Sequence, residues 1–275
     1  MTVLDPAILL ALAVIGLVGG IGITAIGPGG VLATIALFAL TDLTAPEVAG
    51  TAIVTHIGTG LLATAAYVRS GQLRERHTRR DGLALAATAV VGAPLGVVLN
   101  LVIPGRLFGL LLAVLVIAVA VLVWLRERHD GRSEQLSHQQ LSHRQLSHQQ
   151  LSHGQRSHPQ LWVVATIGTA VAAASGIVGV GGPMLTVPLL VVLGVPVLSA
   201  LAAAQAQSIV IATVGSLGYL ATGAIDWHLA ALVGIPELGG VLLGWVIARR
   251  IPTRPLKYAL VATLVASAPY LALTG

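Results

Sequence analysis

The sequence predicts an all-α polytopic membrane protein: two inverted-topology repeats with glycine-broken short helices, and about eight to ten membrane segments. Three observations predict this fold class. The chain is 56% hydrophobic and only 9% charged, with a mean hydropathy of +0.91, whereas soluble domains carry about 25% charged residues. Several apolar runs reach the roughly 20 residues that span a bilayer as a helix. Finally, the second half of the chain repeats motifs of the first half.

The repeat is visible as matched glycines and tyrosines. The cluster Gly27-Pro28-Gly29-Gly30 returns as Gly179-Val180-Gly181-Gly182, and Tyr67-x-x-x-Gly71 returns as Tyr219-x-x-x-Gly223, both 152 positions later (179 − 27 and 219 − 67). The later pairs Gly92 with Gly240 and Gly96 with Gly244 are 148 positions apart. The sequence therefore predicts a first membrane repeat at 1–127, a His/Gln-rich cytoplasmic linker at 128–160 and a second membrane repeat at 161–275.

Eight apolar runs are long enough, or nearly so, to cross a bilayer. Long alternating strands are missing, so helices must satisfy the backbone hydrogen bonds in lipid. The eight runs are Ile8–Ala25, Val48–Val68, Leu83–Ile103, Leu107–Leu125, Leu161–Val180, Leu198–Leu220, Leu229–Ile247 and Leu256–Leu273.

Two further apolar runs, Val31–Leu40 and Met184–Leu193, follow the glycine clusters and extend only ~15 Å as helices. We interpret them as half-helices whose first N–H groups open inside the membrane and form an anion site. The alternative is that the glycines only permit close helix packing. On the first interpretation the substrate-binding glycines are Gly27, Gly29, Gly30, Gly179, Gly181 and Gly182.

The basic residues predict how the chain is oriented. Five arginines lie between Arg69 and Arg80, whereas the matching loop of the second half, Ala221 to His228, has no basic residue. The next loop reverses this pattern, with only Arg106 in the first half and a cluster from Arg249 to Lys257 in the second. By the positive-inside rule, the repeats are inverted, the linker is cytoplasmic and both termini lie outside the cell membrane.

Polar residues occupy matched places after the short runs. Thr51, Thr55 and His56 lie in the first half, and Gln205, Gln207 and Ser208 in the second; Thr55 aligns with Gln207 and His56 with Ser208. We predict that these uncharged donors and one imidazole bind an oxyanion. The alternative role is interhelical hydrogen bonding, which is worth ~0.6 kcal/mol on average in membranes.

Glu237 falls in the middle of an apolar segment, where the first half has Ala89. A carboxylate at the centre of a bilayer costs at least ~2.5 kcal/mol on insertion scales, so such residues are presumed functional unless paired or protonated. We predict that Glu237, with His56, couples transport to protons. The alternative is a protonated Glu237 that is hydrogen-bonded to a neighbouring backbone or His group.

The linker repeats a five-residue unit that brings His138, His143, His148, His153 and His158 into register. Such a tract is a low-complexity expansion without direct function, or it binds metals such as Ni²⁺ or Zn²⁺ or senses pH. The chain has no cysteine, no nucleotide-binding loop, no HExxH motif and no paired carboxylates, so we expect neither an enzyme nor a resident metal or cofactor.

The chain resembles the sulfite exporter TauE/SafE family of membrane permeases. The resemblance rests on the run Ser175-Gly-Ile-Val-Gly-Val-Gly-Gly-Pro183 with Leu185-Thr-Val-Pro188, on Tyr219-x-x-x-Gly223-x-Ile-Asp-Trp227, and on Gly240-x-x-x-Gly244 ahead of Arg249-Arg250. The resemblance implies a cell-membrane protein that moves small anions, often sulfur oxyanions or organosulfonates such as sulfite or sulfoacetate. It assigns the six glycines of the two clusters to the family motif.

These observations predict a secondary transporter that moves a small anion across the cell membrane by alternating access, with protons as a candidate coupling ion. Its partners are then the anionic solute and the lipid bilayer, and not a nucleic acid, because the arginines lie in loops between spans. Two alternatives remain open. One is a divalent-metal permease assisted by the His-rich linker, and the other is a membrane scaffold that transports nothing.

Overall fold

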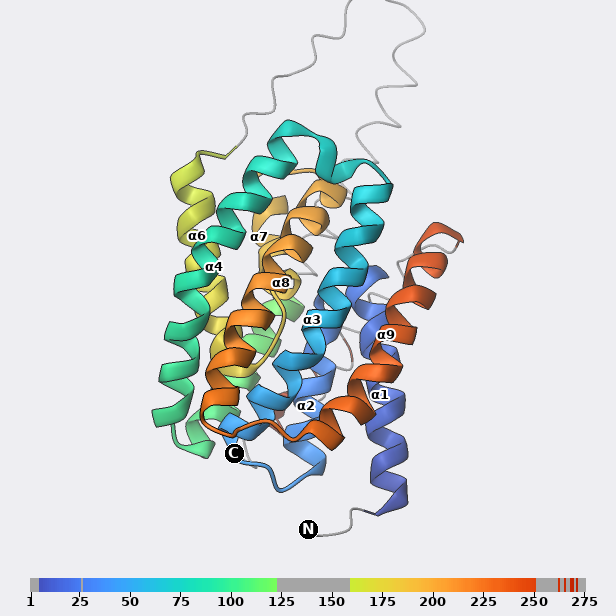
Figure 1. Ribbon diagram of the computed structural model, residues 1–275, viewed down its shortest axis with the longest axis vertical. Helices are drawn as coiled ribbons and strands as arrows, with labels where there is room; N and C mark the ends of the chain where they lie inside the picture. Colours follow the sequence, from blue (N-terminus) through green and yellow to red (C-terminus); the bar gives the residue numbers. More distant parts are fainter. Residues whose placement is uncertain are drawn as a thin grey trace, which may run out of the picture.

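The computed structural model describes residues 5–25, 27–122, 159–250 and the single positions 262, 265, 268, 269 and 271. Every regular element among them is helical, which confirms the all-α prediction (Figure 1). The elements in chain order are α1 Pro6–Ala25, the 3-10 turn η1 Pro28–Gly30, α2 Val31–Leu40, α3 Ala45–Arg69, the 3-10 turn η2 Gln72–Arg74, α4 Arg76–Val102, the helix Gly105–Leu122, α6 Leu161–Val178, α7 Pro183–Val192, α8 Val197–Ala221 and α9 Trp227–Arg250.

Seven of these helices are long and apolar enough to cross a membrane, which confirms seven of the eight predicted spans. They are α1, α3, α4, the helix Gly105–Leu122, α6, α8 and α9. The eighth predicted span, Leu256–Leu273, lies outside the described residues except for the single positions given above. The linker histidines, at 138 to 158, also lie outside them.

The two short helices lie where the glycine clusters end. α2 and α7 have ten residues each, so each covers only ~15 Å. Gly27 and Gly179 have φ angles of 113° and 72°, a backbone region that side chains disfavour, and a proline begins the helical turn that comes next, Pro28 in η1 and Pro183 in α7. The glycines thus turn the chain sharply between α1 and α2 and between α6 and α7.

Each short helix forms a hairpin with the long helix before it, and the two hairpins enter from different ends. In Figure 1, α1 begins at the end of the molecule where the N-terminus lies, and α2 returns to that end. α6 begins at the opposite end, and α7 returns there. The glycine-rich turns of both hairpins therefore lie inside the protein, between its two ends.

Glycines also set the helix pairing, which joins the two halves of the chain. α1 packs along α9, and α4 packs along α6. A Cβ added to Gly20 of α1 would lie 2.8 Å from the Val241 nitrogen of α9. In the other pair, a Cβ on Gly96 of α4 would lie 2.8 Å from the Gly176 Cα of α6. Because glycine has no side chain, the backbones approach closely in both pairs, as is common in membrane helices.

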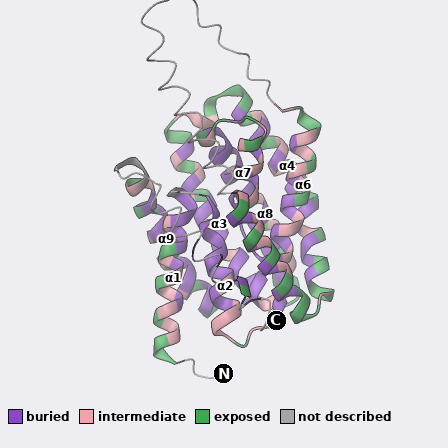
Figure 2. Cartoon of the chain, turned by 180° about the vertical axis from the view of Figure 1, so that it is seen from behind, coloured by how far each residue is buried: buried purple, intermediate pink, exposed green. Residues whose placement is uncertain are grey.

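α3 and α8 form the centre of the bundle. In each of them 61% of the most apolar stretch is buried, against 39% in each of the other five spans. The outer helices expose large apolar side chains, among them Leu10 (67% exposed), Val91 (67%) and Val102 (74%), and Figure 2 shows this exposed periphery around a buried interior. Lipid tails are the solvent that accepts such a surface.

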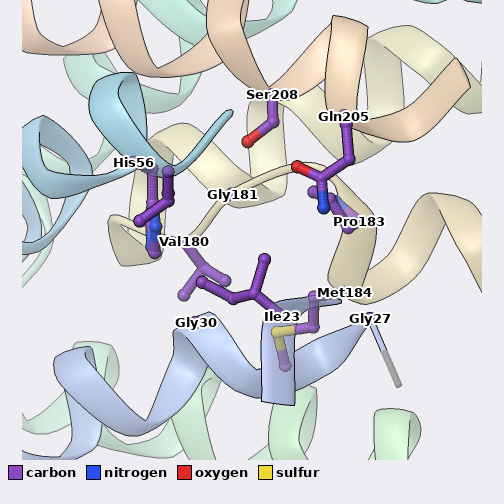
Figure 3. Close-up of a pocket in the computed structure, with 11 residues that line it drawn as sticks. Ile23, Gly27, Gly30, His56, Val180, Gly181, Pro183, Met184, Gln205 and Ser208 are labelled. Carbon is purple, nitrogen blue, oxygen red and sulfur yellow. The ribbon is translucent and has the colours of Figure 1, made fainter. Parts of the chain in front are cut away.

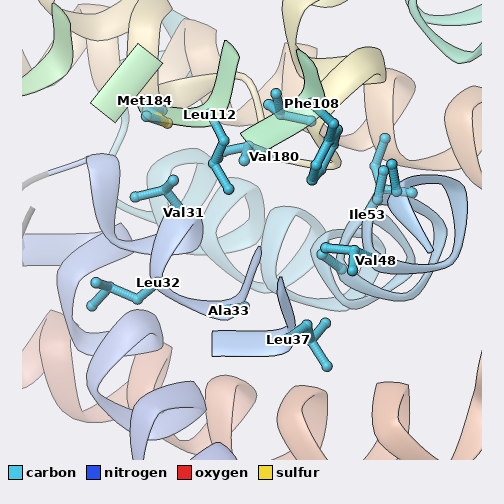
Figure 4. Close-up of a cluster of buried hydrophobic side chains, with 14 of the residues drawn as sticks. Val31, Leu32, Ala33, Leu37, Val48, Ile53, Phe108, Leu112, Val180 and Met184 are labelled. Carbon is cyan, nitrogen blue, oxygen red and sulfur yellow. The ribbon is translucent and has the colours of Figure 1, made fainter. Parts of the chain in front are cut away.

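α2 is buried in protein and not exposed to lipid. Its residues Val31, Leu32, Ala33 and Leu37 pack in one apolar cluster with Val48 and Ile53 of α3, Phe108 and Leu112 of the helix Gly105–Leu122, and Val180 and Met184 near α7 (Figure 4). The rings of Phe38 and Phe108 lie 5.4 Å apart, tilted by 55°. Irregular backbone at membrane depth is tolerated where protein encloses it in this way.

The inner end of α6 has carbonyl groups without partners in their own helix, and side chains from other helices bond to them. The Tyr219 hydroxyl donates to the Gly176 oxygen at 2.7 Å, and the Asn100 amide donates to the Ile177 oxygen at 2.5 Å. Thr34 of α2 donates to the Gly179 oxygen at 3.4 Å. The repeated tyrosine motif thus has a structural role in the second half, because it satisfies a helix end inside the membrane.

Candidate functional site

A narrow cavity lies where the turn after α1, the start of α7, α3 and α8 meet (Figure 3). About 230 Å³ between the lining atoms is unfilled, but most of this space is too narrow for a solvent molecule. The widest part has room for only about one water molecule. The cavity is therefore closed to a larger solute in this conformation. Its walls are formed by Ile23, Gly27, Gly30, His56, Thr59, Val180, Gly181, Pro183, Met184, Gln205 and Ser208.

The cavity has a polar wall supplied by the two central helices. His56 and Thr59 come from α3, and Gln205 and Ser208 come from α8. Each pair has a spacing of three residues, which puts both side chains on one helix face. Figure 3 shows Gln205 and Ser208 pointing into the space beside Gly181. Ile23, Val180 and Met184 close the cavity with apolar side chains.

Two buried nitrogens at this cavity have no hydrogen-bond partner in the described part of the chain. They are Nε2 of His56, a residue 2% exposed, and Nε2 of Gln205, a residue 1% exposed. An unsatisfied buried donor costs about 1–3 kcal/mol. The two nitrogens belong to different halves of the chain and line one cavity, so a single small acceptor between them would satisfy both.

The starts of the two short helices border the same space. Neither the Gly30 start of α2 nor the Gly182 start of α7 is capped by a side chain among the described residues. Uncapped N–H groups and the positive end of the helix dipole favour a negative ligand. A Cβ on Gly30 would lie 2.6 Å from His56 Cε1, and one on Gly181 would lie 2.8 Å from Ser208 Oγ. Glycine at both positions keeps the cavity open.

His56 also contacts an acidic residue behind the cavity. Its Nδ1 atom lies 3.6 Å from Oε1 of Glu237, and the two side chains are 2% and 0% exposed. The distance is longer than a normal hydrogen bond, so the contact is an electrostatic pair. By hydrogen-bond geometry neither carboxyl oxygen of Glu237 has a partner among the described residues, and the hydroxyl of the neighbouring Thr55 donates to the Ala52 carbonyl at 2.9 Å. Glu237 does not line the cavity itself.

Three of the predicted polar residues lie elsewhere. The Gln207 side chain accepts a hydrogen bond from Thr186 at 2.6 Å and donates to the Gly168 carbonyl at 3.1 Å, so it joins α8 to α7 and α6. Thr51 accepts from the Asp226 backbone at 2.9 Å, near the start of α9. Thr55 bonds within α3 and faces α9. These contacts are those of structural residues.

The six predicted glycines divide in the same way. Gly27, Gly30 and Gly181 line the cavity. Gly29 packs against the backbone of α1, and Gly179 against the backbone of Ala49 in α3. Gly182 adjoins the Gln207 side chain, with a Cβ position 3.1 Å from Gln207 Oε1. Only half of the cluster glycines therefore touch the space where a solute would bind.

The sequence prediction missed Thr59, which lines the cavity with 2% exposure. The signal was present, because His56-x-x-Thr59 is the helical spacing that also relates Gln205 to Ser208. The apolar wall residues Ile23 and Met184 were also missed, and they carry no local signal. Among the described residues no three His, Asp or Glu side chains are placed to hold a metal ion.

A comparison with known protein families matches residues 11–271 to the family described as sulfite exporter TauE/SafE. The chain belongs to this family. Neither the curated proteins nor the solved structures include a match. As a TauE/SafE protein with seven span-length apolar helices, the chain is a multi-pass membrane protein of a transporter family.

Proposed function

We propose that this TauE/SafE protein is a secondary transporter that moves a small anion, a sulfur oxyanion or organosulfonate such as sulfite or sulfoacetate, across the cell membrane by alternating access. The observation that carries the proposal is the pair of unpartnered buried nitrogens, His56 Nε2 and Gln205 Nε2, in one cavity bordered by two uncapped helix starts. Donors without acceptors suit an anionic ligand. Family membership supports the choice of a sulfite-type anion.

We propose that 1–127 and 161–275 are inverted repeats joined by the linker 128–160. The opposite entry of the α1–α2 and α6–α7 hairpins supports this proposal (Figure 1). The cavity at their meeting point is too tight for an anion, so transport requires the helices around it to separate. Since α1 packs on α9 and α4 on α6, the parts that move each contain helices of both repeats.

In this proposal the linker and the end of α9 face the cytoplasm. The α3–α4 connection, rich in arginine, lies at the same end of the molecule as the end of α9 (Figure 1). The start of the helix Gly105–Leu122, which carries Arg106, lies at the other end. A concentration of basic residues at one end supports a cytoplasmic assignment for that end.

His56 and Glu237 couple transport to protons in this proposal. His56 reaches the cavity with one nitrogen and faces Glu237 with the other. Intramembrane ionisable pairs of this kind mark proton relays. His56 exchanges the proton beside the anion, and Glu237 acts as a positioning residue that favours the protonated imidazole.

The test is uptake into proteoliposomes with a panel of sulfite, sulfoacetate, taurine, sulfate, acetate and Ni²⁺. We expect sulfite-type anions to accumulate when an inward proton gradient is imposed, and Ni²⁺ to be excluded. Deleting residues 135–158 tests the competing metal permease, since Pro159, which accepts a hydrogen bond from Arg80, stays in place. Anion uptake should change by less than about twofold, because a polar low-complexity linker contributes little to a packed fold. Ni²⁺ uptake that disappears with the linker would instead support a metal permease, and a protein that moves no solute would be a scaffold.

A further inference from the structure

The charges around the cavity limit what kind of anion it can hold. Of the eleven lining residues, His56 is the single ionisable one, and none is Arg, Lys, Asp or Glu. Arginine and lysine are the side chains that most often balance a doubly charged oxyanion. The described walls of this cavity offer one imidazole, amide and hydroxyl groups, and two helix starts.

The described helices around His56 and Glu237 bring no other charged side chain close to this pair. In the described part of the chain, α1, α2, α6 and α7 have no ionisable side chain, and α8 has only Tyr219, whose hydroxyl donates to Gly176. The other charged residues of the described helices belong to the first or last turns of those helices. They are Glu47 and Arg69 on α3, Arg76 to Asp81 on α4, Arg106 on the next helix, and His228, Arg249 and Arg250 on α9.

The two buried groups therefore have to balance their own charge. With one shared proton the pair is neutral, either as carboxylate and imidazolium or as carboxylic acid and imidazole. A buried net charge is strongly disfavoured in a low-dielectric interior, so we expect the empty site to keep one proton. A monoanion that enters alone would make the site negative. A second proton from the same aqueous side restores neutrality, with Glu237 neutral, His56 cationic and the anion beside Nε2.

From this geometry we infer that the site takes a monoanion together with one proton, carries no net charge across the membrane and excludes dianions. Among the proposed substrates this selects hydrogensulfite, and it removes sulfoacetate, which is a dianion at neutral pH. A dianion would leave one negative charge even with both groups protonated. The inference rests on the proposed transport function and specifies the charge of the substrate. No covalent bond changes, and the proton that enters with the anion leaves with it.

The experiment uses two probes whose charge is constant over the working pH range, methanesulfonate as a monoanion and sulfate as a dianion. Purified full-length protein is reconstituted into proteoliposomes, and a potassium gradient with valinomycin sets the membrane potential. The rate of methanesulfonate uptake should depend on the proton gradient and not on the membrane potential. When methanesulfonate is tenfold more concentrated inside the vesicles, an inward proton gradient of about one pH unit should be enough to stop its net efflux. The two driving forces are equal because each is a tenfold concentration ratio. Sulfate uptake should stay at the level of protein-free liposomes.

Two variants identify the group that takes the proton. His56→Gln removes it, so any residual methanesulfonate flux should respond to potential and not to the proton gradient. Glu237→Gln should keep one proton per anion without moving half-maximal uptake to more acidic pH, because glutamine resembles the neutral carboxylic acid of the occupied site. His228→Gln and Glu47→Gln are matched controls, since His228 is exposed at the start of α9 and glutamine can replace Glu47 in its helix cap.

The outcomes separate this inference from the proposed function. If no anion of the panel crosses, the transport proposal fails and the inference with it. If anions cross but methanesulfonate flux follows the potential, or sulfate crosses as well as methanesulfonate, transport stands and the monoanion inference is overturned. If His56→Gln keeps potential-independent, proton-driven uptake, His56 is not the group that takes the proton. Proton uptake on binding, measured in weakly buffered detergent, gives a second readout, and about one proton per bound methanesulfonate is expected for wild type.

Discussion

The central helices α3 and α8 occupy matching places in the two halves, yet their polar residues do different work. At the aligned positions 56 and 208, α3 has a histidine that contacts Glu237, and α8 has a serine that faces the cavity. One position earlier, Thr55 bonds within its own helix, whereas Gln207 joins α8 to two other helices. The position that matches Glu237 is Ala89, which is fully buried. The matched positions of the two halves therefore carry different side chains, and the ionisable pair takes His56 from α3 and Glu237 from α9.

This difference shows how two halves with matching sequence motifs can enclose an asymmetric cavity. Small residues at repeated positions keep the helix pairs close on both sides, as Gly20 does against α9 and Gly96 against α6. A charged group is expensive to bury, so a second buried ionisable pair would add cost. Besides Glu237, the second half contributes neutral groups, of which Gln205 has an amide nitrogen without a partner among the described residues.

The largest expected effect comes from exchanging the matched residues, in the variant His56→Ser with Ser208→His. If the two halves were chemically equivalent, the exchange would preserve proton-driven uptake. We expect the exchanged variant to lose proton coupling, because the residue that matches Glu237 in the first half is Ala89, so a histidine at 208 has no matching carboxyl group. Anion affinity should fall by roughly 10- to 100-fold, because a hydrogen bond from a charged group is worth about 1.5–3 kcal/mol. Uptake at several pH values measures both effects. Full activity in the exchanged variant would contradict the asymmetry.

An intermediate effect is expected from adding a methyl group to the cavity from either side. Gly30→Ala places a Cβ 2.6 Å from His56 Cε1, and Gly181→Ala places one 2.8 Å from Ser208 Oγ. Overpacking typically costs about 1–3 kcal/mol, so uptake should fall roughly tenfold in both variants. The pH profile should change only in Gly30→Ala, which displaces the imidazole. Gly105→Ala is the control, because a Cβ there meets nothing within 4 Å. Equal pH profiles in the two cavity variants would remove the distinction between the two sides.

The smallest effect on transport, and the sharpest separation of roles, should come from the two glutamines of α8. Gln205→Leu removes an unpartnered donor, so anion affinity should fall by about 2- to 10-fold while thermal stability is kept. Gln207→Leu leaves Thr186 and the Gly168 carbonyl without a partner, so the free energy of unfolding should fall by about 1–3 kcal/mol. Anion titration and thermal unfolding in detergent measure these changes. A stability loss in Gln205→Leu with unchanged affinity would reverse the assignment.

Much of the membrane architecture could be predicted because its signals are local. A span needs roughly 20 apolar residues, and seven of the eight predicted runs form helices of that kind. The short helices could also be located, since Gly27 and Gly179 adopt positive φ angles that mark the sharp turns before them. The predicted site residues separate into two groups in space. His56, Gln205 and Ser208 meet at the cavity, whereas Thr51 and Gln207 engage in structural hydrogen bonds.

By itself, the sequence determined the membrane class, the helix positions, the family and the presence of one acidic residue in the middle of a span. Only the tertiary structure decided that Glu237 faces His56 across 3.6 Å, that α9 pairs with α1, and that Thr59 belongs to the cavity while Gln207 does not. The physical reason is that apolar length and glycine conformation act within one segment of chain. Which polar atoms find a partner depends on the neighbouring helices, and two of the atoms left without one, Nε2 of His56 and Nε2 of Gln205, meet at the candidate site.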